Sequence, residues 1–303
     1  MPVFARQLLG IGRLPDDLRA EVEAREYLAD YLAVTRQVSG ITAQAGRSQR
    51  RPTGCHRAGQ QAPRGFYDGR MTGHAFSPQE RAAVYRVILE RRDMRRFVPG
   101  SVVPDDVLKR VLYAAHAAPS VGLMQPWRFI RITDDALRRR IHALVDEERL
   151  LTAQALGPRA QEFLRLKVEG ILDCAELLVV ALCDGRDAYV FGRRTLPQMD
   201  LASVSCAIQN LWLSARSEGL GMGWVSLFDP QRLAALLSMP DDAEPVAILC
   251  LGPVPDFPDR PALELDGWAV ARPLAEFVSE NGWSPSAQPG RLPDRFGGVE
   301  RNR

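Results

Sequence analysis

Three arginines and one aspartate crowd the segment Arg91–Arg95, which reads Arg-Arg-Asp-Met-Arg. Guanidinium groups bind phosphate oxygens in a bidentate manner, so this cluster could hold a dianionic phosphate. A solvated charge cluster at the C-terminus of a helix would explain the arginines equally well, because cations are favoured there. It does not explain Asp93, since a carboxylate is disfavoured at that end of a helix. The aspartate therefore indicates a second purpose for the segment.

Two further segments carry residues that suit a ligand. Ala118–Trp127 contains Ser120, Gly122 and Gln125, which offer hydrogen-bonding groups and close backbone approach to the edge of a flat heteroaromatic ring. The same residues could also form an ordinary helix-to-strand turn. Gly219–Ser226 has three glycines at a spacing of two, and these precede an expected strand, so they are not a dinucleotide-binding fingerprint. They would let the backbone lie close to something flat or to another chain.

Hydrophobic periodicity predicts the elements that must position these segments. The expected helices begin at or near capping or proline residues and cover Ser77–Arg91, Pro104–Ala115, Asp135–Ile171 with an interruption at Gly157–Pro158, Met199–Glu218 and Gln231–Leu237. The helix at Met199–Glu218 is the clearest, with Leu201, Val204, Ile208, Leu211, Trp212 and Ala215 on one face. The expected strands are Phe129–Ile132, Leu177–Cys183, Gly223–Leu227 and Val246–Leu251. This order favours an α+β fold over regular βαβ repeats.

Composition narrows the class of protein. The chain has 303 residues, 46% of them hydrophobic and 25% charged, with a net charge of +2, as in an ordinary globular protein. We therefore expect a cytoplasmic protein with neither a nucleic-acid nor a membrane partner, since no apolar run reaches about 18 residues. The five cysteines form no CxxC pair, and four of them (Cys174, Cys183, Cys206 and Cys250) lie in apolar runs that indicate buried thiols. His116 and His142 lack partners at ligand spacing, so we expect no metal.

The two ends of the chain differ in composition from its centre. Residues 45–70 contain no Leu, Ile, Val or Met, which indicates a linker or disorder. We expect residues 1–70 to be a poorly structured extension, either a real appendage or upstream sequence included by too early a start codon. The main domain should cover residues 71–284. Residues 285–303 are rich in Pro, Gly and polar residues and should form a flexible tail.

Taken together, the segments at Arg91–Arg95, Ala118–Trp127 and Gly221–Ser226 resemble the flavin-dependent nitroreductase superfamily. Within it, the chain resembles the BluB family of 5,6-dimethylbenzimidazole synthases over residues 76–284. Pro197–Leu201 and Ala207–Leu213 belong to the same resemblance. Superfamily members that only reduce nitroaromatics or quinones usually carry Ser at the position of Asp93, so this aspartate distinguishes the synthases.

The resemblance implies a nitroreductase-like α+β fold with a central mixed or antiparallel sheet flanked by helices. It implies a homodimer with FMN at the interface, extended termini that embrace the partner, and a lid at Arg159–Glu169. The residues at matching cofactor positions are Arg91, Arg92, Asp93, Met94, Arg95, Ser120, Gly122, Gln125 and Ser226, and we add His116 because it lies one turn earlier in the same helix. Asp93 and Ser226 match the two catalytic positions.

The implied reaction uses FMN as its substrate. Reduced FMN, supplied by a separate flavin reductase, reacts with O2 and is fragmented to 5,6-dimethylbenzimidazole, the lower ligand of vitamin B12, and erythrose 4-phosphate. Asp93 in a closed apolar pocket could accept and return protons, while Ser226 could orient the flavin or Asp93. Two alternatives stay open: an NAD(P)H-dependent nitroreductase or flavin reductase with FMN as a cofactor, and a catalytically silent flavin-binding protein.

Overall fold

A computed structural model describes residues 75–279 and 281–283 of the chain. The expectations for the extension at residues 1–70, the domain boundary at Met71 and the tail at residues 285–303 lie outside these residues. None of the helices in the described ranges combines the length and apolar content needed to cross a membrane.

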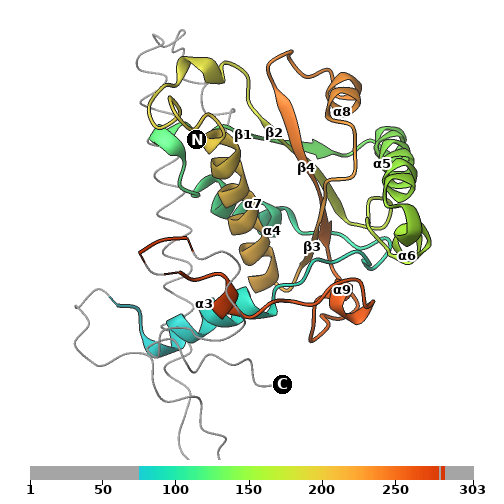
Figure 1. Ribbon diagram of the computed structural model, residues 1–303, viewed down its shortest axis with the longest axis horizontal. Helices are drawn as coiled ribbons and strands as arrows, with labels where there is room; N and C mark the ends of the chain where they lie inside the picture. The colour runs from blue at the N-terminus through green and yellow to red at the C-terminus, as the bar shows by residue number, and fades with distance from the viewer. Residues whose placement is uncertain (1–74, 280, 284–303) are drawn as a thin grey trace, which may run out of the picture. The chain divides into compact units, whose positions relative to one another are not determined.

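A four-stranded sheet forms the centre of the domain (Figure 1). Its strands, in spatial order, are β1 (Trp127–Ile132), β2 (Glu176–Leu182), β4 (Glu244–Gly252) and β3 (Gly221–Val225), and each neighbouring pair is antiparallel. All four predicted strands are present, and the sheet is antiparallel rather than mixed. Strand β3 begins two residues before the predicted start and ends two residues before the predicted end, so Gly221 lies within the strand together with Gly223.

The helices follow the predicted order with one substantial correction. The α-helices are α3 (Pro78–Glu90), α4 (Asp105–His116), α5 (Asp135–Ala155), α6 (Ala160–Arg165), α7 (Met199–Ser217), α8 (Pro230–Leu236) and α9 (Ala262–Leu265). Short 3-10 turns lie at Val121–Leu123, Gly157–Arg159, Arg186–Ala188 and Leu274–Glu276. The predicted helix to Ile171 is wrong, because helical structure ends at Arg165. Residues 167–170 have no regular secondary structure, and Gly170 packs against the Phe97 ring, where a Cβ atom would lie 2.5 Å from the ring.

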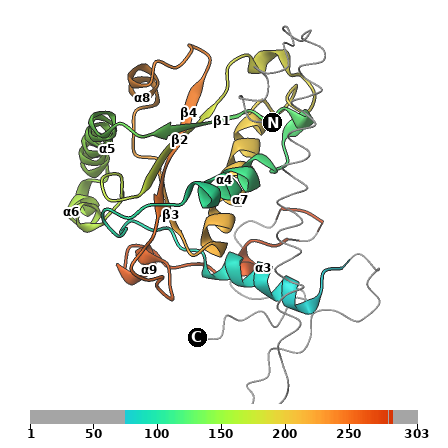
Figure 2. The same ribbon diagram turned by 180° about the vertical axis from the view of Figure 1, so that it is seen from behind.

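The two faces of the sheet carry separate apolar layers. Helices α4 and α7 cover one face, and α5 and α8 cover the other (Figures 1 and 2). Alternate residues of β2 point to opposite layers, with Leu178 and Val180 on the α7 side and Leu177 and Val179 on the α5 side. The whole of β2 is therefore buried, as its continuous apolar sequence predicted.

Two residues predicted to be buried are exposed. Leu201 lies in the first turn of α7, where Asp200 and Ser203 occupy the inward positions and bind polar groups of neighbouring loops. Cys206 points away from the core on the opposite side of α7 from Ile208. The other three cysteines in apolar runs are buried, as expected.

Candidate active site

The arginine-rich segment leaves its helix before Asp93. Helix α3 starts with the predicted cap, in which Ser77 and Glu80 form a capping box around Pro78. It ends at Glu90, and Arg91 already has extended backbone angles (φ −59°, ψ 135°). From there the chain runs beside the edge strand β3, where the Met94 N–H donates to the Met222 carbonyl at 2.8 Å. Asp93 is therefore not a misplaced helix-terminal carboxylate but part of an extended segment paired with β3.

Two glycines of β3 make this close approach possible. A Cβ atom at Gly223 would lie 2.1 Å from the Met94 carbonyl oxygen and 2.8 Å from Nη1 of Arg95. A Cβ atom at Gly221 would lie 3.0 Å from the Met94 side chain. The glycine run was expected to face something flat or another chain, and its close neighbour here is the arginine-rich segment of the same chain. Gly219 has a different task, since its φ of +78° follows the end of α7.

The carboxylate of Asp93 is oriented by two groups. Arg95 forms an ion pair with both of its oxygens, and the Trp224 N–H donates to Oδ1 at 3.1 Å. The Asp93 side chain is 41% exposed and that of Arg95 is 19% exposed. The closed apolar pocket expected around Asp93 is therefore not formed by the described residues alone. The carboxylate is held in place, yet one side of it remains open.

The arginines differ in how their donors are used. Arg92 donates to the carbonyls of Pro258 (3.0 Å), Asp259, Leu89 and Arg91. The guanidinium of Arg91 instead lies over the Trp212 ring at 4.4 Å, and it donates no hydrogen bond to the described part of the chain. Burial lowers the pKa of Arg91, Asp93 opposes that shift and Arg92 adds to it, but an arginine remains charged. Arg91 is thus the member of the cluster with donors available for an anion.

The turn at Ser120–Gln125 has an unusual backbone. Gly122, Leu123 and Gln125 all have left-handed φ angles of +55°, +54° and +48°. Such angles are rare for residues with side chains, and they cluster at functional sites. The Ser120 hydroxyl accepts the Gln125 N–H at 3.0 Å, so it stabilises the turn from within. Leu123 is 82% exposed at the tip.

His116 lies behind this turn at the end of α4. Its Nδ1 accepts a hydrogen bond from the indole N–H of Trp127 at 3.2 Å, and its Nε2 lies 3.5 Å from the side-chain amide of Gln125. The two rings meet edge to face with centroids 6.0 Å apart. The structure therefore joins His116, Gln125 and Trp127, although no sequence pattern connects Trp127 with His116.

Sequence reasoning missed a buried ion cluster that supports the turn. Asp200 in the first turn of α7 accepts from Arg186 at 3.0 Å and from Arg193 at 3.1 Å. These contacts fix the loop at residues 184–198, and Phe191 of that loop lies so close to Gly122 that a Cβ there would be 3.1 Å from its ring. The one sequence signal for this cluster was Asp200, an acidic residue in the Pro197–Leu201 run to which the sequence alone assigns no role.

Ser226 and the predicted lid lie at the far end of β3. Ser226 directly follows the strand, is exposed, and makes no side-chain hydrogen bond within the described ranges. Its neighbour Leu227 packs against the apolar cluster of Ala153, Phe163 and Leu166, so the lid segment reaches the strand end that carries Ser226. Burial raises the pKa of Glu169 in this segment, but hydrogen bonds from the Ile171 N–H and Lys167, together with the charges of Lys167 and His142, bring this pKa below its usual value.

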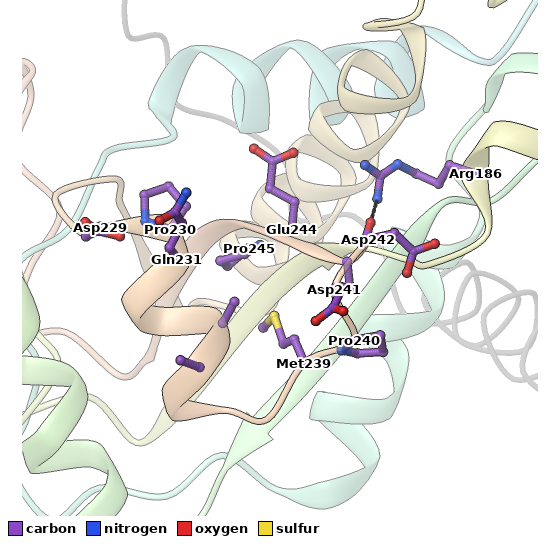
Figure 3. A pocket seen from close by; sticks show the side chains of 13 residues that line it. Arg186, Asp229, Pro230, Gln231, Met239, Pro240, Asp241, Asp242, Glu244 and Pro245 are labelled. Atoms are coloured by element: carbon purple, nitrogen blue, oxygen red, sulfur yellow. Dashed lines mark hydrogen bonds between the residues drawn. The ribbon is translucent and has the colours of Figure 1, made fainter.

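A cavity of about 910 Å³ lies elsewhere, between α8 and the start of β4 (Figure 3). Arg186 borders it and donates to the Asp242 carbonyl at 2.8 Å. None of the predicted site residues lines this cavity. Within the described residues no three metal-ligating side chains gather at one place.

Comparison with known proteins identifies the family to which this chain belongs. Residues 88–253, more than half of the chain, match the model of the Nitroreductase family. The chain belongs to the nitroreductase family. Among solved structures of similar shape is an NADPH:FMN oxidoreductase from Vibrio harveyi complexed with NAD+, with a TM-score of 0.51, 21% identity, and coverage of 67% of this chain and 79% of that one. That likeness concerns the fold alone.

Within the nitroreductase family, the chain is similar to 5,6-dimethylbenzimidazole synthases. It is 38% identical to the synthase of Rhodospirillum rubrum over 208 residues, which is 67% of this chain and 96% of the relative. It is 37% identical to the synthase of Rhodobacter capsulatus over 196 residues, or 64% of this chain and 94% of the relative. These matches confirm the resemblance inferred from the three sequence segments and place this nitroreductase in the synthase family.

Proposed function

We propose that the protein catalyses the O2-dependent fragmentation of reduced FMN to 5,6-dimethylbenzimidazole and erythrose 4-phosphate. The observation that carries the proposal is the 38% identity to a 5,6-dimethylbenzimidazole synthase over 96% of its length. Asp93 supports it further, because this carboxylate stands in the arginine-rich segment where many nitroreductases have Ser.

The described residues suit FMN. Arg91 has donors available for the phosphate or the ring, while Arg92 and Arg95 are held by protein groups and would shape the segment around the ligand. Gly122 and its left-handed neighbours expose backbone and the Gln125 amide, which a flat ring with polar edges could use. When bound, reduced FMN supplies the electron-rich ring that reacts with O2.

Asp93 and Ser226 are the proposed catalytic residues. Arg95 and the Trp224 N–H hold the Asp93 carboxylate in one orientation while leaving it partly exposed, as a group that accepts and returns a proton requires. Ser226 comes two residues after Trp224, and its exposed hydroxyl could orient the flavin or Asp93. Closure of Arg159–Glu169 would exclude water, since this segment already packs against Leu227.

The active assembly is a homodimer in this proposal. Helix α3 has no buried residue, although it carries Val84, Tyr85, Ile88 and Leu89, all of which are exposed. An apolar face of this kind indicates a surface that another chain covers. A second copy that covers it would also close the partly open surroundings of Asp93. Reduced FMN would come from a separate flavin reductase in a transient encounter.

Incubation of the protein with chemically reduced FMN in air tests the proposal. Chromatographic detection of 5,6-dimethylbenzimidazole supports the synthase. Rapid consumption of NAD(P)H with a nitroaromatic acceptor, without this product, would instead identify a conventional nitroreductase or flavin reductase. If FMN binds and neither reaction occurs, the protein is a flavin-binding protein. Light scattering of the same sample checks the dimer.

A further inference from the structure

We infer that Trp127 and His116 are positioning residues that fix the side-chain amide of Gln125 so that its NH2 group donates to the ligand. The inference deepens the proposed function, and it rests on that function only for the identity of the ligand as a flavin.

The indole of Trp127 determines which nitrogen of His116 carries the proton. An indole N–H can only donate a hydrogen bond, so Nδ1 of His116, 3.2 Å away, must offer a lone pair. A neutral imidazole with a lone pair at Nδ1 carries its proton at Nε2. Trp127 is only 4% exposed and packs its ring edge to face with the imidazole, so water does not compete for this contact.

The protonated nitrogen of His116 then orients Gln125. Its Nε2 lies 3.5 Å from the side-chain amide of Gln125, at a position assigned to the amide nitrogen, which would set two donors against each other. A half-turn of the amide about its last side-chain bond exchanges the two atoms, so that the oxygen accepts the Nε2 proton. The imidazole proton therefore places the amide oxygen of Gln125 toward His116.

The backbone restricts Gln125 as well. Its φ is +48°, and its N–H is held by the Ser120 hydroxyl at 3.0 Å. With backbone and amide oxygen both fixed, the NH2 group of Gln125 is the remaining polar group of the side chain. It presents two N–H donors and no acceptor, so it fits a carbonyl oxygen or an unprotonated nitrogen at the edge of a heteroaromatic ring.

The tautomer can be measured without ligand. Long-range 1H–15N spectra of the full chain labelled with [15N]histidine distinguish a protonated Nε2 from a protonated Nδ1, and the signals lost in His116→Phe identify this residue. We expect the Nε2-protonated form in the wild type and a weaker preference in Trp127→Phe, which keeps the aromatic packing but lacks the N–H. A protonated Nδ1 in the wild type would overturn the inference.

A double-mutant cycle tests whether His116 acts through Gln125. The dissociation constant of oxidised FMN, followed by flavin fluorescence, is compared for His116→Phe, Gln125→Ala and the double variant. We expect His116→Phe to weaken binding about 2- to 10-fold alone, as expected for one misdirected hydrogen bond, and to add almost nothing once Gln125 is alanine. Equal losses in both backgrounds would contradict the coupling.

Two further variants sharpen the result. Gln125→Glu keeps the shape but removes both donors, so it should weaken binding at least as much as Gln125→Ala. Trp283→Phe is a matched control at a residue that is 93% exposed, and it should leave FMN binding unchanged.

If the tautomer and the coupling hold while no 5,6-dimethylbenzimidazole forms, the proposed function fails and the inference stands. If the product forms but the coupling is absent, the inference alone fails.

Discussion

The arginine-rich segment and the Ser120–Gln125 turn both carry the residue types expected of a ligand site, yet they are built in opposite ways. Arg91–Arg95 lies against β3 through backbone bonds and fits over Gly221 and Gly223, so its path is part of the sheet. The turn precedes β1 and pairs with no strand; its backbone is held by two serine hydroxyls, since Ser120 accepts from the Gln125 N–H and Ser203 accepts from the Val121 N–H.

This difference shows which residues of each region are left to contact a ligand. In the arginine-rich segment Arg92 and Arg95 are bonded to groups of the protein. Arg91 and Asp93 are therefore the residues that can bind or react with a ligand, because Arg91 has guanidinium donors available and Asp93 is partly exposed. In the turn the polar groups mainly hold one another, and Gln125 is the member left to face a ligand. Substitutions in the first region should therefore separate cleanly into chemical and structural effects, whereas those in the turn should change geometry.

The largest expected effect concerns the chemistry of Asp93. Asp93→Asn should lower the rate of 5,6-dimethylbenzimidazole formation by about 100- to 10,000-fold, because an amide cannot accept and return the proton. FMN affinity should change by less than about fivefold, since the lost ion pair with Arg95 is partly exposed. Product chromatography and fluorescence titration measure the two quantities. Asp106→Asn, on the exposed first turn of α4, is the control, and unchanged product formation in Asp93→Asn would remove Asp93 from the mechanism.

A smaller effect distinguishes Arg91 from Arg92. Arg91→Ala should weaken FMN binding by about 10- to 150-fold, the loss of one charge-assisted hydrogen bond, with little change in stability. Arg92→Ala should instead reduce the free energy of unfolding, since its guanidinium joins the chain to the carbonyls of Pro258 and Asp259. Calorimetric titration with FMN and urea unfolding separate these effects. A greater affinity loss in Arg92→Ala would reverse the assignment.

Packing between β3 and the arginine-rich segment gives the third prediction. Gly223→Ala should reduce the free energy of unfolding by about 1–3 kcal/mol, because the new methyl group overlaps the Met94 backbone and Arg95. Gly219→Ala keeps the left-handed angle without any overlap and isolates the backbone cost. At Gly282 a Cβ meets nothing within 4 Å in the described part of the chain and the φ is ordinary, so Gly282→Ala should be neutral. Equal effects at Gly223 and Gly282 would show that the segment does not depend on this fit.

Local features of the fold were predictable from the sequence. The capping box at Ser77 and Glu80 and the left-handed Gly219 depend on a few neighbouring residues, so their residue types reveal them. The buried strand β2 followed from its apolar run. Asp93 stood out because its charge did not fit the helix end it was assigned to, although the structure then moved it off the helix.

Features that depend on distant partners were not predictable. Nε and Nη2 of Arg92 meet carbonyls more than 160 positions away in the chain. Asp200 meets two arginines of a loop whose path no periodicity describes. The glycines of β3 signalled a close neighbour but not its identity. The left-handed angle of Leu123 carried no signal at all, since a leucine rarely adopts it.

The left-handed φ angle of Leu123 gives the smallest expected change in stability, and it tests directly whether the Ser120–Gln125 turn is strained. Leu123→Gly should change the free energy of unfolding by less than about 1 kcal/mol, with a slight gain, because relief of the left-handed strain offsets the added flexibility of the unfolded chain. Leu196→Gly makes the same chemical change at an exposed residue with an ordinary angle and should cost about 0.5–1 kcal/mol. Thermal unfolding of the two variants provides the comparison. A larger loss of stability in Leu123→Gly than in Leu196→Gly would contradict the strain, and it would show that contacts of the Leu123 side chain hold the turn.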